Sequence, residues 1–217
     1  MLEVSGLDVH IERTQILRAV SLAVAKGTMA GLIGRNGAGK TTLMRSIMGL
    51  VAPSRGAVRI GEADVTSAAA HRRASLRVGY MPEDRRLVPE LTAEENILVP
   101  VWATGGAGAG PRLAWIYALI PEVAALAQRR ALQLSGGQQK LVALGRALMA
   151  GERLLLLDEP FEGIAPALAQ RLVEVLRAIK AEGLSILLSE SDYTHSQGLV
   201  DRLYVIERGA VAEKPQF

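Results

Sequence analysis

The chain has 217 residues, which is enough for one well-buried α/β domain with a small subdomain but too few for two nucleotide-binding domains. Hydrophobic residues make up 49% and charged residues 22%, as in an ordinary soluble protein, and a net charge of +3 does not indicate a nucleic-acid partner. Because the chain lacks cysteine, disulfides, thiolate metal sites and a cysteine nucleophile are excluded.

The sequence contains no pattern typical of a membrane-spanning or secretory segment. The longest stretch without charge, 96–111, is too short for a spanning helix and contains Pro100 and several glycines. The N-terminus has no basic patch followed by an apolar core. We therefore expect any membrane role to come through a partner.

The N-terminal third is predicted to be mostly β-structure. Segments 4–11 and 17–24 carry β-branched and apolar residues in partial alternation, which predicts a hairpin-like pair of half-buried strands. Residues 42–50 have apolar side chains at helical spacing. Further short strands are expected at 28–33, 57–60 and 78–81. His71, Arg72 and Arg73 are expected on a solvated helix face.

Residues 90–130 have a different character and are predicted to form a mostly helical subdomain. Thr92 and Glu95 have the spacing of a capping box that opens a helix. The segment 104–110 reads T-G-G-A-G-A-G and is expected to be a flexible connection. We expect this subdomain to be inserted into a core formed by 1–89 and 131–217.

The C-terminal third alternates strands and helices. Four consecutive leucines, 154–157, predict a strand covered on both faces, and segments 184–188 and 203–206 repeat that pattern. Helices are predicted at 138–149, 166–181 and 193–200; Pro166 occupies the first turn, where a helix tolerates proline. This order predicts an α/β fold, with a mostly parallel sheet between helices and an antiparallel β piece at the N-terminus.

A glycine-rich segment predicts a phosphate-binding loop. Residues 34–42 read G-R-N-G-A-G-K-T-T and fit the pattern G-x-x-x-x-G-K-[ST], between a predicted strand and a predicted helix. Glycines let backbone N–H groups point inward, and the helix N-terminus adds positive potential for an anion. Lys40 is expected to reach the β- and γ-phosphates and Thr41 to hold Mg²⁺; a chance match of a glycine-rich turn is the alternative. The residues expected to bind the nucleotide are Gly34, Arg35, Asn36, Gly37, Ala38, Gly39, Lys40, Thr41 and Thr42.

Two carboxylates follow the leucine strand. The carboxyl end of a strand beside a phosphate loop is where such a sheet places its chemistry. Asp158 is expected to hold Mg²⁺, directly or through water, and Glu159 to polarise a water that attacks the γ-phosphate. An acidic turn after a core strand is the alternative, and the phosphate loop makes it the weaker one.

A third motif, L-S-G-G-Q-Q at 134–139, precedes the acidic strand and begins a predicted helix. With G-R-N-G-A-G-K-T-T and L-L-L-L-D-E-P in the same order, the chain resembles an ATP-binding-cassette (ABC) ATPase over essentially its whole length. The resemblance implies a P-loop NTPase core, the cofactors ATP and Mg²⁺, and a head-to-tail dimer. In such a dimer Ser135, Gly136, Gly137 and Gln138 would contact the nucleotide held by the partner.

Within the family, the chain resembles subunits of branched-chain (hydrophobic) amino-acid importers of prokaryotes. The resemblance lies in G-Y-M-P-E-D-R-R at 79–86, L-T-A-E-E-N-I at 91–97 and D-E-P-F-E-G-I-A-P at 158–166. It implies that Glu83, where most cassettes carry glutamine, contacts Mg²⁺ and the water and assists catalysis. Importers of urea and short amides share much of this pattern, so the substrate rests on analogy.

Three positions depart from the family pattern. Ile11, next to His10, stands where an aromatic residue usually stacks on adenine, so we expect weak discrimination between ATP and GTP. Ser191 stands where most relatives carry histidine, or glutamine in the amino-acid branch, and we expect slow turnover because serine is shorter and never cationic. His195 is expected at the surface. The loop at 164–166 lacks a common aspartate, so communication between the two sites of a dimer is expected to differ. Together the three departures suggest a different, more complete cassette subunit as partner, although a homodimer stays open.

The function that this resemblance implies is therefore an ATPase subunit of a prokaryotic importer for hydrophobic amino acids or related small solutes, bound at the cytoplasmic face of the membrane. Its implied partners are permease subunits, a second ABC ATPase subunit and, indirectly, a solute-binding protein, with no nucleic acid. The alternatives are a cassette protein acting on ribosomes or DNA, a phosphate-loop kinase, and a regulator that binds ATP with little turnover.

Overall fold

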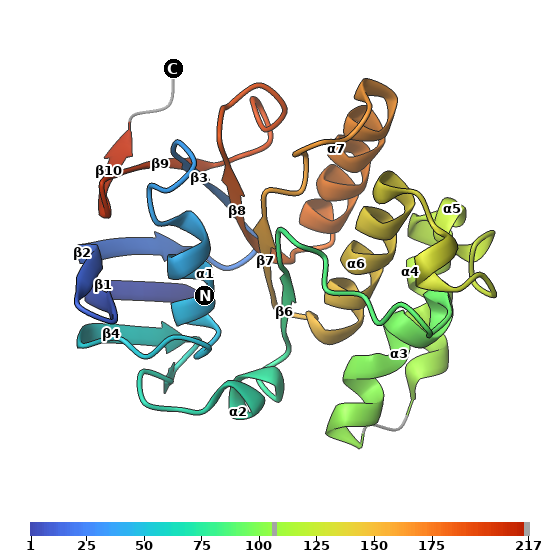
Figure 1. Ribbon diagram of the computed structural model, residues 1–217, viewed down its shortest axis with the longest axis horizontal. Helices are drawn as coiled ribbons and strands as arrows, with labels where there is room; N and C mark the ends of the chain where they lie inside the picture. The colour runs from blue at the N-terminus through green and yellow to red at the C-terminus, as the bar shows by residue number, and fades with distance from the viewer. Residues whose placement is uncertain (106–107, 215–217) are drawn as a thin grey trace.

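Two β-sheets organise the chain, and helix α1 (Lys40–Ile47) lies between them (Figure 1). The computed structural model describes residues 1–105 and 108–214. Within them, no helix is both long and apolar enough to cross a bilayer. The structure neighbours given below and the sheet order agree with the predicted α/β class.

The antiparallel sheet has the order β2-β1-β4-β5. Its strands are β1 (Leu2–Ile11), β2 (Thr14–Val24), β4 (Arg55–Ile60) and β5 (Ala63–Asp64). The predicted hairpin is confirmed by the antiparallel pairing of β1 with β2. The alternation of buried residues is only partial because the register shifts between Val4 and Leu7, both of which are buried on the side of α1.

The central sheet has the order β10-β9-β3-β8-β7-β6, and all of its pairings are parallel except that of β10 with β9. Its strands are β3 (Met29–Ile33), β6 (Val78–Met81), β7 (Leu154–Asp158), β8 (Ser185–Glu190), β9 (Arg202–Glu207) and β10 (Ala210–Lys214). Every residue of β7 and β8 is buried, as the continuous apolar runs predicted. The sequence prediction missed β5 and β10, whose residues are mostly exposed.

Alternate residues of β7 face two different cores. Leu154 and Leu156 pack with α1 and the antiparallel sheet, whereas Leu155 and Leu157 pack with α6 (Gly136–Ala150) and α7 (Pro166–Ala181). On the far side of α6 lie α3 (Ala93–Thr104), α4 (Ala109–Leu119) and α5 (Pro121–Ala124), which share its core (Figure 1). The short helices α2 (Ala70–Ala74) and η1 (Ala131–Gln133) complete the fold.

The capping predicted at the start of α3 is present. The backbone N–H of Thr92 donates to Glu95 Oε2 at 2.7 Å, and that of Glu95 donates to Thr92 Oγ1 at 3.1 Å. The expected connection 104–110 is shorter than predicted, since α3 continues to Thr104 and α4 begins at Ala109. Residues 106–107 of that prediction lie outside the described part of the chain.

The helix predicted at 193–200 is wrong: the chain makes a series of turns there. The backbone N–H of Thr194 donates to the Asp192 carboxylate, and the Ser196 hydroxyl donates to the Glu190 carboxylate. Short polar side chains that bond locally compete with helical hydrogen bonds, and Gly198 adopts a φ of 76°. This segment therefore returns the chain from β8 to β9 without a helix.

Arg73 corrects a second prediction. His71 and Arg72 are exposed, but only 1% of Arg73 is exposed. Its guanidinium donates to the carbonyl oxygens of Ser46 at 2.9 Å, Ile47 at 2.6 Å, Ala68 at 3.0 Å and Thr66 at 3.1 Å. The carbonyls of Ser46 and Ile47 lie at the end of α1, where a helix has carbonyl groups without i+4 partners, and that of Ser46 also accepts from the Gly49 N–H. Arg73 is thus a buried cap for the helix that follows the phosphate loop.

Candidate functional site

The phosphate loop joins β3 to α1, and its glycines are required by close backbone contacts. A Cβ on Gly34 would lie 2.4 Å from the carbonyl oxygen of Ile206, and Gly39 has a φ of 114°. The Gly34 N–H donates to the carbonyl of Glu190, which ties the loop to the end of β8. A cavity of about 660 Å³ lies beside the loop and includes Ser191 among its lining residues.

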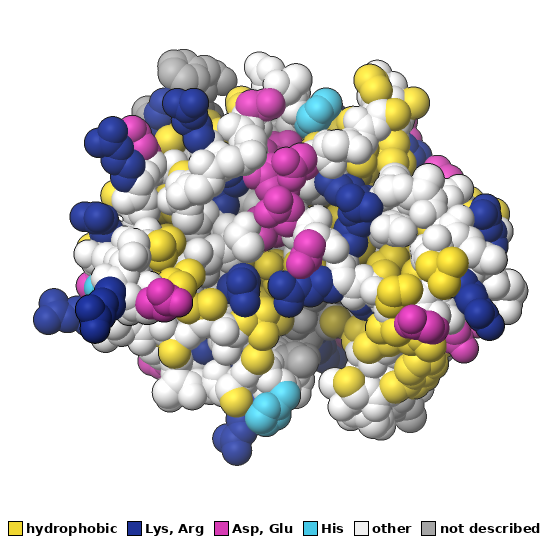
Figure 2. Space-filling view, in the orientation of Figure 1, with side chains coloured by type: hydrophobic (Ala, Val, Ile, Leu, Met, Phe, Trp, Pro, Cys, Tyr) yellow, Lys and Arg dark blue, Asp and Glu magenta, His cyan; other side chains and the backbone are white. Residues whose placement is uncertain are grey.

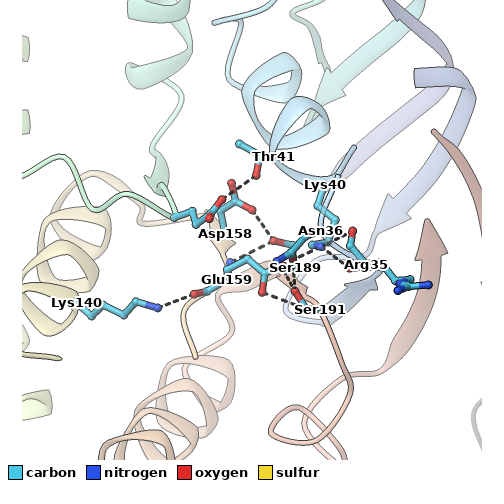
Figure 3. Close-up of polar contacts among 11 residues, drawn as sticks. Arg35, Asn36, Lys40, Thr41, Lys140, Asp158, Glu159, Ser189 and Ser191 are labelled. Atoms are coloured by element: carbon cyan, nitrogen blue, oxygen red, sulfur yellow. Dashed lines mark hydrogen bonds and ion pairs between the residues drawn. The ribbon is translucent and has the colours of Figure 1, made fainter. Parts of the chain in front are cut away.

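Lys40 lies inside this loop with 5% of its surface exposed. Its ammonium donates to the carbonyl oxygens of Gly34 and Arg35, the latter at 3.1 Å. It also forms an ion pair with Glu159, with Nζ 3.0 Å from Oε1 (Figure 3). The predicted phosphate clamp and the predicted general base are therefore paired with each other, so a γ-phosphate that binds Lys40 must compete with a carboxylate of this chain.

Ser191 joins Glu159 to the phosphate loop. Its Oγ lies 2.9 Å from Glu159 Oε1 and 2.8 Å from Asn36 Oδ1, and its N–H donates to Glu159 Oε2 at 3.1 Å (Figure 3). One hydroxyl proton can serve only one of two acceptors, so the other contact requires the Asn36 amide to donate. The ends of β7 and β8 thus bring Glu159 and Ser191 to the loop, as parallel strands of one sheet do.

Asp158 is fully buried at the end of β7. The Ser189 hydroxyl donates to its Oδ1 at 2.6 Å and the Tyr80 hydroxyl to its Oδ2 at 3.4 Å. Burial is the main reason that the pKa of Asp158 is raised, and these hydrogen bonds act in the opposite direction. The sequence analysis missed Ser189 and Tyr80; the signal for Ser189 was a hydroxyl at the polar end of an otherwise apolar strand.

Glu83 completes an acidic cluster around the predicted Mg²⁺ position. The Thr41 hydroxyl lies 3.5 Å from Glu83 Oε2. Desolvation, followed by the charges of Glu162, Asp158 and Glu159, raises the pKa of the Glu83 carboxyl. Acidic side chains occupy the centre of this face in Figure 2, with basic side chains on either side.

The donor set at this cluster fits Mg²⁺. In the described residues, no three histidine or carboxylate side chains gather as a metal centre made by protein alone. Mg²⁺ favours oxygen ligands and commonly uses one or two carboxylates together with substrate phosphates. Thr41, Asp158 and Glu83 would supply the protein oxygens, and nucleotide phosphates the others.

The residues Ser135 to Gln138 lie apart from this cluster. Ser135 caps α6, and its capping box with Gln138 is closed by N–H donations of 2.9 Å and 3.3 Å. Ser135, Gly137 and Gln138 line a different cavity, of about 550 Å³. Within one chain the structure therefore assembles the phosphate loop with Asp158, Glu159 and Ser191, and leaves the L-S-G-G-Q segment outside.

Three of the remaining candidates also lie outside the cluster. Ile11 is 44% exposed, and the His10 ring is hydrogen-bonded to Ser54, with Nδ1 3.1 Å from Oγ. Neither lines the cavity beside the phosphate loop. His195 is exposed and stacks on Phe161 with ring centroids 5.0 Å apart.

Glu190 lies at the end of β8 with 3% of its surface exposed, and burial raises the pKa of its carboxyl to about 7. Because the folded-state pKa exceeds the ordinary 4.5, the fold favours the neutral carboxyl of Glu190. Its contribution to the free energy of unfolding is therefore complete below pH 4.5 and is lost as the pH rises through 7. We expect Glu190→Gln to be more stable than the wild type by about 3 kcal/mol at pH 8 and by little at pH 5. Urea unfolding at both pH values measures this difference; an equal difference at both would contradict it.

A phosphate loop between a parallel strand and a helix, with a buried acidic strand end beside it, defines the class of P-loop nucleoside triphosphatases. The family model of the ABC transporter matches residues 17–162. The chain is 33% identical over 211 residues to the high-affinity branched-chain amino acid transport ATP-binding protein BraG of Pseudomonas aeruginosa, covering 97% of this chain and 91% of that one. It is also 33% identical over 220 residues to the lipopolysaccharide export system ATP-binding protein LptB of Acidithiobacillus ferridurans, covering 100% and 91%.

A solved structure of the ADP conformation of an ATP-binding cassette from an ABC transporter superposes with a TM-score of 0.86 at 28% identity, covering 100% of this chain and 91% of that one. The chain therefore belongs to the ABC transporter family and is an ATP-hydrolysing subunit of a transporter.

Proposed function

We propose that this ATPase energises the import of branched-chain or other hydrophobic amino acids, bound at the cytoplasmic face of the membrane to permease subunits. Two observations support this choice: the P-E-D-R-R and E-G-I-A-P segments at 82–86 and 162–166, and the similarity to BraG along 97% of the chain. The urea and short-amide importers stay the alternative on the same motifs. Equal identity to LptB makes lipopolysaccharide export the second candidate.

We assign the chemistry of the site as follows. Glu159 accepts a proton from the attacking water, after ATP has replaced the carboxylate as the partner of Lys40. With the γ-phosphate as its new partner, Lys40 stabilises the negative charge on that group during the reaction. Thr41, Asp158 and Glu83 would hold Mg²⁺, which would supply positive charge against the nucleotide phosphates.

The dimer proposal rests on the position of α6. Ser135 and Gly137 lie beside a cavity distinct from the one at the phosphate loop, so one chain alone does not assemble both halves. A second cassette in head-to-tail arrangement would place the N-terminus of one α6 against the nucleotide of the other chain. The partner is a second copy or a more complete cassette subunit, and the solute-binding protein acts through the permease.

Transport in cells tests the proposed substrate. A strain that carries Glu159→Gln in place of the wild type should lose uptake of labelled leucine, isoleucine and valine, and the chain should co-purify with a permease from native membranes. Glu162→Gln is the matched control, since it removes an exposed carboxylate from the same loop. If the Glu159→Gln strain keeps normal amino-acid uptake but loses urea uptake, the urea importer is selected. If it keeps amino-acid uptake but retains lipopolysaccharide in the inner membrane, lipopolysaccharide export is selected.

Ser191 keeps open a role as a regulator with little turnover, and a substitution tests it. We expect Ser191→His to hydrolyse ATP faster than the wild type, because an imidazole reaches further and can carry positive charge near the γ-phosphate. The position is suitable, since Ser191 Oγ already contacts Glu159 and Asn36. Steady-state phosphate release measures the effect; an unchanged or lower rate would contradict it.

A further inference from the structure

Lys140 is a buried cation with no role in the site described above. It lies on α6, five positions after Ser135, and only 2% of its surface is exposed. Its ammonium donates to the carbonyl oxygen of Glu159 at 2.9 Å (Figure 3). It also donates to the carbonyl oxygen of Glu162. A buried ammonium is costly to desolvate, so these two backbone contacts are what hold it in place.

The backbone that Lys140 contacts is held in an unusual conformation. Glu159 has a φ of 50°, in the left-handed region that residues with a side chain adopt at a cost. Its N–H donates to the carbonyl of Ser189, and the Glu162 N–H donates back to the carbonyl of Glu159. Lys140 contacts this turn from α6. The backbone position of Glu159 therefore depends on β7, which precedes it, on β8 and on α6.

The same helix also contacts the loop that bears Glu83. The Arg85 guanidinium, in the loop that also bears Glu83, donates to the side chain of Gln139 at 3.2 Å and lies 3.4 Å from the carbonyl of Gly136. The first turns of α6 therefore contact the L-S-G-G-Q segment, the Glu83 loop and the Glu159 turn. A shift of α6 would reach Glu159 through the ammonium of Lys140.

We propose that Lys140 is a positioning residue that sets the Glu159 carboxylate for hydrolysis and couples it to movement of the L-S-G-G-Q segment. Lys140 touches neither nucleotide-binding residues of the phosphate loop nor their cavity. Its loss should therefore affect the chemical step and leave nucleotide binding intact. A purely structural role predicts a different result, namely a parallel loss of stability, binding and turnover.

The test uses Lys140→Met, which keeps most of the length of the side chain and removes the ammonium. The matched control is Lys26→Met, at an exposed lysine. In the purified protein we expect kcat to fall roughly ten- to hundredfold in the Lys140 variant, with the Kd for ATP and KM changed by less than about twofold. Hydrogen exchange should speed up at the amides of 159–163 and stay unchanged in β8. The Lys26 variant should match the wild type.

An unchanged kcat in folded Lys140→Met would overturn the proposal, as would an equal loss of ATP affinity. If that variant does not fold, Lys140→Gln decides, since its amide keeps a donor but is too short to reach both carbonyls. A lowered kcat at constant KM in Lys140→Gln supports the proposal, and wild-type kcat overturns it.

Discussion

Glu159→Gln is expected to abolish turnover while strengthening ATP binding. Loss of the carboxylate removes the proposed general base, which should lower kcat by about 10²–10⁴-fold. The same change removes the ion pair in which Glu159 Oε1 lies 3.0 Å from Lys40 Nζ. Freed from that partner, Lys40 should bind ATP roughly tenfold more tightly, since a charge-assisted hydrogen bond contributes about 1.5 kcal/mol.

Phosphate release and a direct ATP titration measure the two effects separately. Glu162→Gln controls for the loss of one negative charge near the site, since Glu162 is exposed in the same turn. It should leave kcat within about threefold and affinity nearly unchanged, because an exposed charge is well screened. If the two variants gained the same affinity, general electrostatics and not the Lys40 pair would be responsible. A Glu159→Gln enzyme that still turns over normally would remove Glu159 from the proposed role.

Arg73→Met should lower the free energy of unfolding by about 3 kcal/mol, because four carbonyl oxygens each lose a hydrogen bond from the buried guanidinium. The substitution keeps the apolar part of the side chain, so the loss reflects the guanidinium. The carbonyls of Ser46 and Ile47 end α1, and the phosphate loop begins that helix, so local opening of α1 should also weaken ATP binding.

The control for Arg73 lies next to it. Arg72 is exposed on the same short helix, so Arg72→Met should change stability by no more than about 0.5 kcal/mol. Urea unfolding, with and without ATP, measures both variants. Wild-type stability in Arg73→Met would mean that these carbonyls find other donors and that the buried cation is dispensable for α1.

Much of the local structure could be predicted because its causes lie close together in the chain. The leucines of β7 and the exact bounds of β6 and α7 follow from apolar runs and from Pro166 at a first turn. The capping box of Thr92 with Glu95 spans three residues. The predictions failed at 193–200, where local hydrogen bonds of polar side chains compete with helical hydrogen bonds. They also failed in the short connection after α3, where the sequence pattern is weak.

The sequence by itself determined the phosphate loop, the acidic strand end and the order of strands and helices, because glycine turns, apolar runs and caps act over a few neighbouring residues. The site assignments built on those motifs stay predictions for the variants above. Only the tertiary structure decided that Arg73 is buried, that Lys140 holds the Glu159 turn and that Glu159 pairs with Lys40. The physical reason is that a cation's surroundings depend on which distant carbonyls and carboxylates the fold brings to it, and spacing along the chain does not carry that information.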